Sequence, residues 1–175
     1  MNNLRRYLLN IFPWRNIAIL TVIFYALVIL RAVPANGTEN LYATGPLKEI
    51  DRCGSAWLIK RYIDKKAEFR FYPEGAIITE GIAFDTPDAQ FRRNHRFSTF
   101  ESIMINYKLK EKGLHILAEI IHDIEICAWE KRKKYRKILH DIRVITADNK
   151  TDKQRLKGCL SYFDNFLKNP PPHKK

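Results

Sequence analysis

Three side chains suited to metal binding are spaced so that they would share one face of a helix. His115, Glu119 and His122 are separated by four and three residues, and positions three or four apart are neighbours on a helix surface. Imidazole and carboxylate groups bind transition metals, so His122, Glu119 and Glu101 are the candidate metal ligands. The structural alternative is that His122 bonds to the backbone or to Glu101, while His115 is exposed near the helix start.

Glu101 and Asp51 also have a structural interpretation as helix caps. The segment from Ser98 to Glu101 has the Ser-x-x-Glu pattern of a capping box, in which the glutamate accepts the amide hydrogen of the serine. Asp51 stands where its carboxylate could cap the helix predicted to follow it. For Glu101, capping and a role in a site remain open alternatives, and for Asp51 capping is favoured.

A second candidate site would bind an anion. Arg52 lies at the predicted start of a helix, where unpaired backbone amides and the helix dipole attract a tetrahedral oxyanion. The candidate ion pocket consists of Asp51, Arg52, His95 and Arg96, with Arg92 and Arg93 close by in the sequence. The Asp51 carboxylate competes with an anion for the same amides, so a cap and a bound oxyanion are alternatives there.

Length and charge limit the class of protein. The chain has 175 residues, enough for one domain of ordinary size. Lys plus Arg number 31 against 19 Asp plus Glu, a net charge of +12, which suits an anionic partner such as nucleic acid, phospholipid or a small oxyanion. With 46% hydrophobic residues and only 7 glycines, the chain is not a disordered, collagenous or multi-span membrane protein.

The first 35 residues read as a signal peptide or an uncleaved membrane anchor. They hold four arginines and no acid. Three of these arginines precede an uncharged stretch from residue 17 to 30, and small residues lie near Ala35. We therefore expect four parts: the leader at 1–35, a linker at 36–46, the folded domain at 47–168 and a Pro/Lys tail at 169–175. The body of the protein is expected to be exported, to a periplasmic or extracellular location.

A basic run includes Lys131, Arg132, Lys133 and Lys134. Such a run can bind nucleic acid, but an exported protein has little access to it, so no nucleic-acid partner is expected. Contact with anionic lipid headgroups at the membrane surface is the partner that fits this location.

The three cysteines, Cys53, Cys127 and Cys159, are far apart and form no Cys-x-x-Cys pair. This spacing argues against a zinc knuckle or a thioredoxin-type site. Because an exported chain is in an oxidising environment, one disulfide is possible. An odd number of cysteines leaves one thiol over, and the sequence does not indicate which.

The order of predicted elements indicates an α+β fold. Alternation and apolar runs predict strands at 68–72 and 81–84, and residues 47–50 would complete a small sheet. Helical spacing predicts helices at 52–64, after 98, at 114–126, at 130–139 and at 156–167. We expect a small β-sheet in the N-terminal half, packed against four to five helices, with a helix-rich C-terminal half.

Six segments together resemble the chromate-resistance exported protein family in order and spacing. They are Asp51-Arg52, 57–64, 67–69, Phe84-Asp85, 99–101 and 121–125. The resemblance covers residues 48–126 well and implies a contribution to chromate tolerance, without a defined chemical activity. Larger members carry a further N-terminal domain and a regulatory role. The family often has a cysteine where this chain has Ser98, which weakens a redox role for that position.

The sequence therefore predicts an exported accessory protein that contributes to chromate resistance by binding a metal ion or an oxyanion. The only cofactor that the residues suggest is one transition-metal ion. The alternative is a metal-dependent enzyme, hydrolytic or redox, that uses His122 with a carboxylate of Glu119 or Glu101.

Overall fold

The computed structural model describes residues 40–127, 131, 133–147 and 150–169. The predicted leader at 1–35, Arg132 and the tail after Asn169 lie outside these ranges. The described residues all belong to one contact unit, Gly37–Lys175. In this part of the chain, no helix is both long enough and apolar enough to cross a membrane.

Three short parallel strands form the sheet. The strands are β1 (Leu41–Thr44), β2 (Glu68–Phe71) and β3 (Ile82–Ala83), in the order β2-β1-β3, with Tyr42 opposite Phe69 and Ile82. The predicted strands at 68–72 and 81–84 are confirmed. The predicted strand at 47–50 is wrong, because Ile50 already begins a helix. The central strand is instead β1, whose buried residues lie inside the segment predicted to be a linker.

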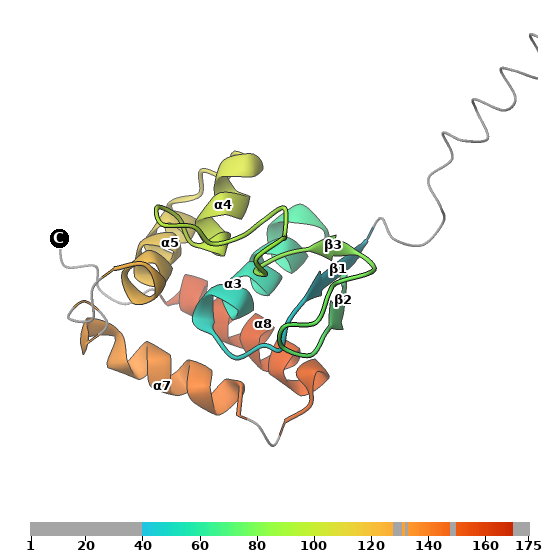
Figure 1. Cartoon of the computed structure of the whole chain (residues 1–175). Helices are drawn as coiled ribbons and strands as arrows, with labels where there is room; N and C mark the ends of the chain where they lie inside the picture. The colour runs from blue at the N-terminus through green and yellow to red at the C-terminus, as the bar shows by residue number, and fades with distance from the viewer. Residues whose placement is uncertain (1–39, 128–130, 132, 148–149, 170–175) are drawn as a thin grey trace, which may run out of the picture. The chain divides into compact units, whose positions relative to one another are not determined.

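The helix α3 (Ile50–Leu58) is buried along its whole length and continues as a π-helix, η1 (Ile59–Ile63). Figure 1 shows α3 in the middle of the described domain, packed against α4, α5 and α8. Gly54 permits this close packing, because a Cβ added there would lie 2.9 Å from Cδ1 of Ile121 on α5. The helix predicted from the sequence at 52–64 is therefore present and central.

Among the described residues, four further helices belong to the α+β fold that the sequence predicts. They are α4 (Thr99–Asn106), α5 (Lys112–Glu125), α7 (Arg136–Ile145) and α8 (Asp152–Lys168), with a 3₁₀ turn, η2 (Lys133–Tyr135), before α7. Residues 136–139 of the helix predicted at 130–139 lie in α7, which extends to Ile145, and residues 130 and 132 lie outside the described ranges. Ser98 and Glu101 form the predicted capping box of α4.

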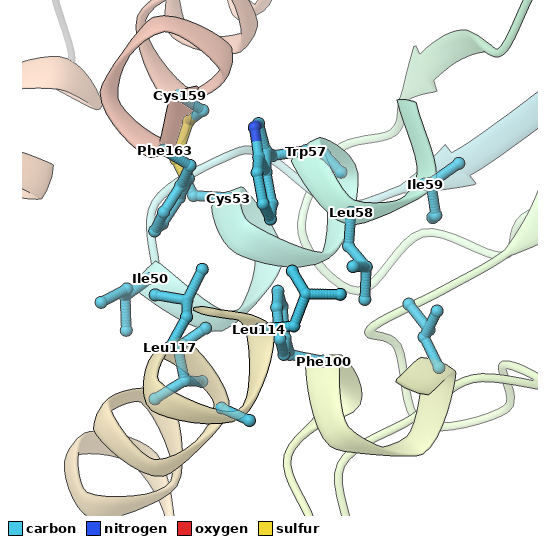
Figure 2. Packing of buried hydrophobic residues seen from close by; sticks show 14 of the residues in the cluster. Ile50, Cys53, Trp57, Leu58, Ile59, Phe100, Leu114, Leu117, Cys159 and Phe163 are labelled. Atoms are coloured by element: carbon cyan, nitrogen blue, oxygen red, sulfur yellow. A yellow bond between two sulfur atoms is a disulfide. The ribbon is translucent and has the colours of Figure 1, made fainter. Parts of the chain in front are cut away.

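A disulfide between Cys53 and Cys159 joins α3 to α8 inside the core. Figure 2 shows the bridge beside Phe163 and Trp57, with Phe100 and the leucines of α5 packed below them. Cys127 is a free cysteine. The sequence did not indicate which of the three cysteines is unpaired, and the structure shows that it is Cys127.

Candidate functional site

The Asp51 carboxylate caps a helix, but a different helix from the one predicted. The backbone N–H groups of Thr99 and Phe100 donate to Asp51 Oδ2 and Oδ1 at 2.7 and 2.8 Å. Asp51 therefore caps α4, which starts 48 residues later in the sequence. Its own helix α3 has Glu49 as the N-cap residue, with no side-chain hydrogen bond. The interpretation of Asp51 as the cap of its own helix is wrong.

Arg52 is buried and bound to Asp85, which follows β3. Arg52 Nε donates to Asp85 Oδ2 at 2.9 Å, and Arg52 Nη2 donates to the Asp85 carbonyl at 3.1 Å. Arg52 Nη1 donates to the carbonyl of Pro46 at 2.8 Å. The Thr99 hydroxyl donates to the second Asp85 oxygen at 2.6 Å. A Cβ at position 45 would lie 2.9 Å from Arg52 Nη1, which explains Gly45. The guanidinium is therefore engaged with protein acceptors.

The electrostatics of the two buried carboxyls favour protonation of Asp51. Burial raises the pKa of the Asp51 carboxyl from 3.8 to about 7, and repulsion from Asp85 adds to the rise. The backbone N–H groups of Phe100 and Thr99 oppose this rise in pKa. Burial also raises the pKa of Asp85, against the Thr99 hydroxyl and the charge of Arg52. Two buried acids thus repel each other, and one of them, Asp85, is paired with Arg52.

The unfolding free energy is expected to fall as pH rises from 4.5 to 7.5, by up to about 1.4 kcal/mol for each pH unit. Folded Asp51 keeps its proton until about pH 7, whereas its ordinary pKa is 3.8, so the folded state binds more protons in this window. The stabilisation is complete below 3.8 and lost as pH rises through 7. The Arg61 hydrogen bond lowers the pKa of Asp164, so that group titrates below the window.

Urea denaturation at several pH values measures this slope. Asp51→Asn is expected to flatten it, whereas Asp88→Asn, at an exposed position, is expected to retain it. A parent protein whose stability does not change between pH 4.5 and 7.5, or an Asp51→Asn variant with the parent's slope, would contradict this assignment.

Glu101 and His122 form a pair between α4 and α5. His122 Nδ1 lies 2.9 Å from Glu101 Oε2, and the same oxygen accepts the backbone N–H of Ser98 at 2.8 Å. Capping and the histidine contact therefore occur together, as the structural alternative proposed. Glu119 and His115 lie on the exposed side of α5. Within the described ranges, no three His, Cys, Asp or Glu side chains are grouped so that they could hold a metal ion.

His95 and Arg96 lie on an exposed loop before α4. The Asn94 side chain accepts the backbone N–H groups of Arg96 and Phe97 at 2.8 and 2.9 Å. In the part of the chain that is described, no hydrogen bond or ion pair joins His95 or Arg96 to Asp51 or Arg52. Only Asp51 and Arg52, of the four candidate pocket residues, share contacts, through Thr99 and Asp85.

A cleft lined by basic side chains lies at the start of α3. It has a volume of about 390 Å³, and the described residues that line it include four bases and two acids, namely Lys48, Lys133, Arg136, Arg143, Glu49 and Glu125. We call it the cation-lined cleft. Its apolar lining comes from Ile50, Leu139 and Ile142. The cleft therefore joins the start of α3 and the end of α5 to one face of α7.

Arg93 adds a fifth base beside this cleft. Arg93 Nη1 donates to Glu125 Oε2 at 2.7 Å, and Arg93 Nη2 donates to Glu49 Oε2 at 3.4 Å. Both acids of the cleft are thus bonded to Arg93. Among the described residues, no carboxylate forms an ion pair with Lys133, Arg136 or Arg143, so bases outnumber acids in the described lining of the cleft.

The basic run that was predicted to contact a membrane is divided among different contacts. Lys131 Nζ lies 2.9 Å from Asp123 Oδ1, and Lys133 lines the cation-lined cleft. Lys134 Nζ lies 5.1 Å from the centre of the Tyr135 ring. Lys133 was singled out in the sequence as part of this run. The sequence did not predict that Lys48, Arg136 and Arg143 line one cleft, because Lys48 is distant in sequence from the other two.

Comparison with known proteins gives one family and one curated relative. The family described as ChrB, C-terminal domain, matches residues 42–169. Protein ChrB of Cupriavidus metallidurans is 30% identical over 98 residues, which cover 55% of this chain and 30% of that protein. The matched segment is thus less than a third of the relative's length. No solved structure matches the chain.

Proposed function

Because the chain belongs to the chromate-resistance ChrB family, we propose that it acts in chromate resistance by binding a tetrahedral oxyanion in the cation-lined cleft. The observation that carries this proposal is the set of four basic side chains around one cleft of about 390 Å³. Chromate carries two negative charges near neutral pH, and guanidinium and ammonium groups bind such anions through charge-assisted hydrogen bonds.

The cleft is a better anion site than the surroundings of Arg52. An oxyanion at Arg52 would have to displace Asp85, with which this arginine forms two hydrogen bonds. It would also compete with Asp51 for the amides that start α4. In the cation-lined cleft, Arg136 and Arg143 have no carboxylate partner among the described residues. The anion can therefore bind without breaking a buried ion pair, whose loss is costly.

The start of α3 adds to the positive potential of the cleft. Glu49 and Ile50 line it, and no side chain caps this end of the helix. The N-terminal end of a helix carries a partial positive charge, which favours a nearby anion. The basic side chains remain the main source of affinity, and the helix dipole adds to them.

The metal-dependent enzyme that the sequence raised as an alternative has less support. A metal site needs several ligands in one place, and no group of three suitable side chains occurs within the described ranges. The closest arrangement is the pair of Glu101 and His122, in which the glutamate oxygen already accepts hydrogen bonds from Ser98. We therefore propose binding of an oxyanion and not catalysis.

We also propose that the protein acts outside the cytoplasm. The basic, acid-free leader supports export. The Cys53–Cys159 disulfide supports it independently, because disulfides persist in oxidising compartments and are rare in the cytosol. If this disulfide forms in cells, the folded domain is in an oxidising compartment.

Titration with chromate and with sulfate, by calorimetry at low salt, tests the oxyanion proposal. Arg136→Gln and Arg143→Gln are each expected to weaken binding about tenfold, the usual effect of losing a hydrogen bond to a charged group. Lys65→Gln, at an exposed position beyond the other end of α3, is the control and should bind as the parent does.

Arg96→Gln distinguishes this proposal from the pocket that the sequence suggested. If Arg96→Gln weakens binding while Arg136→Gln and Arg143→Gln do not, the oxyanion binds at the 92–97 loop and our placement is wrong. If the parent binds neither anion, the proposed function itself is wrong.

A further inference from the structure

Three exposed apolar side chains flank or end α4: Phe97 precedes the helix, Ile105 lies in its last turn and Tyr107 follows it. Ile105 is 58% exposed, Tyr107 40% and Phe97 39%. Phe97, Glu101 and Ile105 follow at steps of four, so they share one face of α4 and the turn before it. They border a groove of about 320 Å³ that also contains Met104, Leu109 and Ala118. Clustered exposed apolar groups of this kind mark a contact surface.

Three lysines follow this apolar group in the sequence. Lys108 and Lys110 line the groove, and Lys112 is the first residue of α5. No carboxylate in the described part of the chain forms an ion pair with these lysines. Glu101, the acid of the groove, is bonded to Ser98 and His122 instead. The groove is therefore apolar at its centre with two lysines in its lining, and the Glu111 carboxylate accepts the backbone N–H of Lys110 beside it.

Lys108 holds a backbone conformation that lysine disfavours. Its φ is 54°, in the left-handed region where glycine is the usual residue. The backbone N–H groups of Lys108 and Leu109 donate to the carbonyls of Ile105 and Met104 at 3.2 and 3.0 Å, which is the Schellman pattern that ends many helices with glycine. Lys108 thus occupies a position where glycine would make the domain more stable. Residues with strained backbone conformations of this kind occur at functional sites.

We propose that this surface, formed by Phe97, Ile105, Lys108 and Lys110, docks on an anionic lipid membrane. Apolar side chains enter the boundary between headgroups and acyl chains, and lysines contact the lipid phosphates. A protein partner fits less well, because lysine is depleted in protein–protein interfaces. Long lysine side chains can cover apolar surface while their charged ends reach the headgroups.

Hydrogen exchange of the full chain, with and without vesicles, tests the proposal. Vesicles that contain phosphatidylglycerol should protect the backbone amides of residues 104–112, and vesicles of phosphatidylcholine alone should protect them much less. The 1–35 segment is the same in all variants, so any vesicle binding through that segment is common to them. Protection confined to 104–112 is therefore specific to the proposed surface.

Two variants separate docking from folding. Lys108→Gly is expected to weaken binding to phosphatidylglycerol vesicles about fivefold, the effect of one basic residue near an anionic surface. The same change is expected to raise the melting temperature, because glycine readily adopts the left-handed backbone conformation at this position. Ile105→Gln is expected to weaken binding about tenfold through the loss of apolar burial. Ile77→Gln is the matched control, since Ile77 is 84% exposed and lies elsewhere, beside Arg52.

Several outcomes would overturn the proposal. The first is that anionic vesicles do not change the exchange of the backbone amides of residues 104–112. The second is that vesicles protect these amides equally in the parent, in Lys108→Gly and in Ile105→Gln. Protection of these amides that increases with protein concentration, in the absence of lipid, would show that a second copy of the chain covers the surface instead.

Discussion

Replacing Arg52 by methionine is expected to lower the free energy of unfolding by roughly 3 to 5 kcal/mol. Arg52 is 7% exposed and donates three hydrogen bonds to Asp85 and Pro46. Methionine fills much of the same space but leaves the Asp85 carboxylate buried without its cation. Asp51, also fully buried, lies close enough to repel Asp85, so the loss of the arginine affects two acids.

Urea denaturation of Arg52→Met measures this loss. Arg52→Met combined with Asp85→Asn should recover a large part of it, because the second change removes the uncompensated charge. Arg70→Met removes an arginine from an exposed pair with Glu80 and should leave the denaturation midpoint almost unchanged. A fall of less than about 1 kcal/mol for Arg52→Met would show that the buried pair does not organise this part of the fold.

Removal of the disulfide, by Cys53→Ala together with Cys159→Ala, is expected to destabilise the domain by about 4 kcal/mol. The bridge joins residues 106 apart in sequence, so it restricts a large part of the unfolded chain. It also lies in the core beside Phe163 and Trp57 (Figure 2). Its loss therefore removes both a constraint on the unfolded state and a link between α3 and α8.

Thermal or urea denaturation with and without a reducing agent provides the measurement. The parent should lose stability on reduction, whereas Cys53→Ala with Cys159→Ala should not respond to the reductant. Cys127→Ala is the control, because Cys127 is a free cysteine. If reduction leaves the parent's denaturation midpoint unchanged, the bridge does not stabilise the domain. Cell fractionation with alkylation of free thiols shows in addition where the oxidised protein is found.

The elements that the sequence predicted well are those with strong local signals. The Ser98 and Glu101 pattern located the start of α4, and the apolar spacing of 114–126 located α5. The central strand was missed because β1 has only four residues and lies among residues typical of a linker. The α+β class followed from the helices and the two other strands, and did not depend on β1.

The candidate site was harder to predict because its contacts connect distant parts of the chain. Asp51 could be identified as a capping residue, but only the fold shows that it caps a helix 48 residues away. Lys48 and Arg143 line one cleft because α7 packs near the start of α3, and no local pattern encodes that packing. The contact between Glu101 and His122 was one of the alternatives that the sequence raised for this histidine, and the structure contains it.

The location of bound chromate in a crystal tests the central claim most directly. Chromium scatters X-rays anomalously, so its position can be found without assuming a site. We expect one anomalous peak in the cation-lined cleft, within hydrogen-bond distance of at least two of Lys133, Arg136 and Arg143. A peak beside Arg52 or Arg96, or no peak in crystals that contain chromate at a saturating concentration, would contradict the proposal.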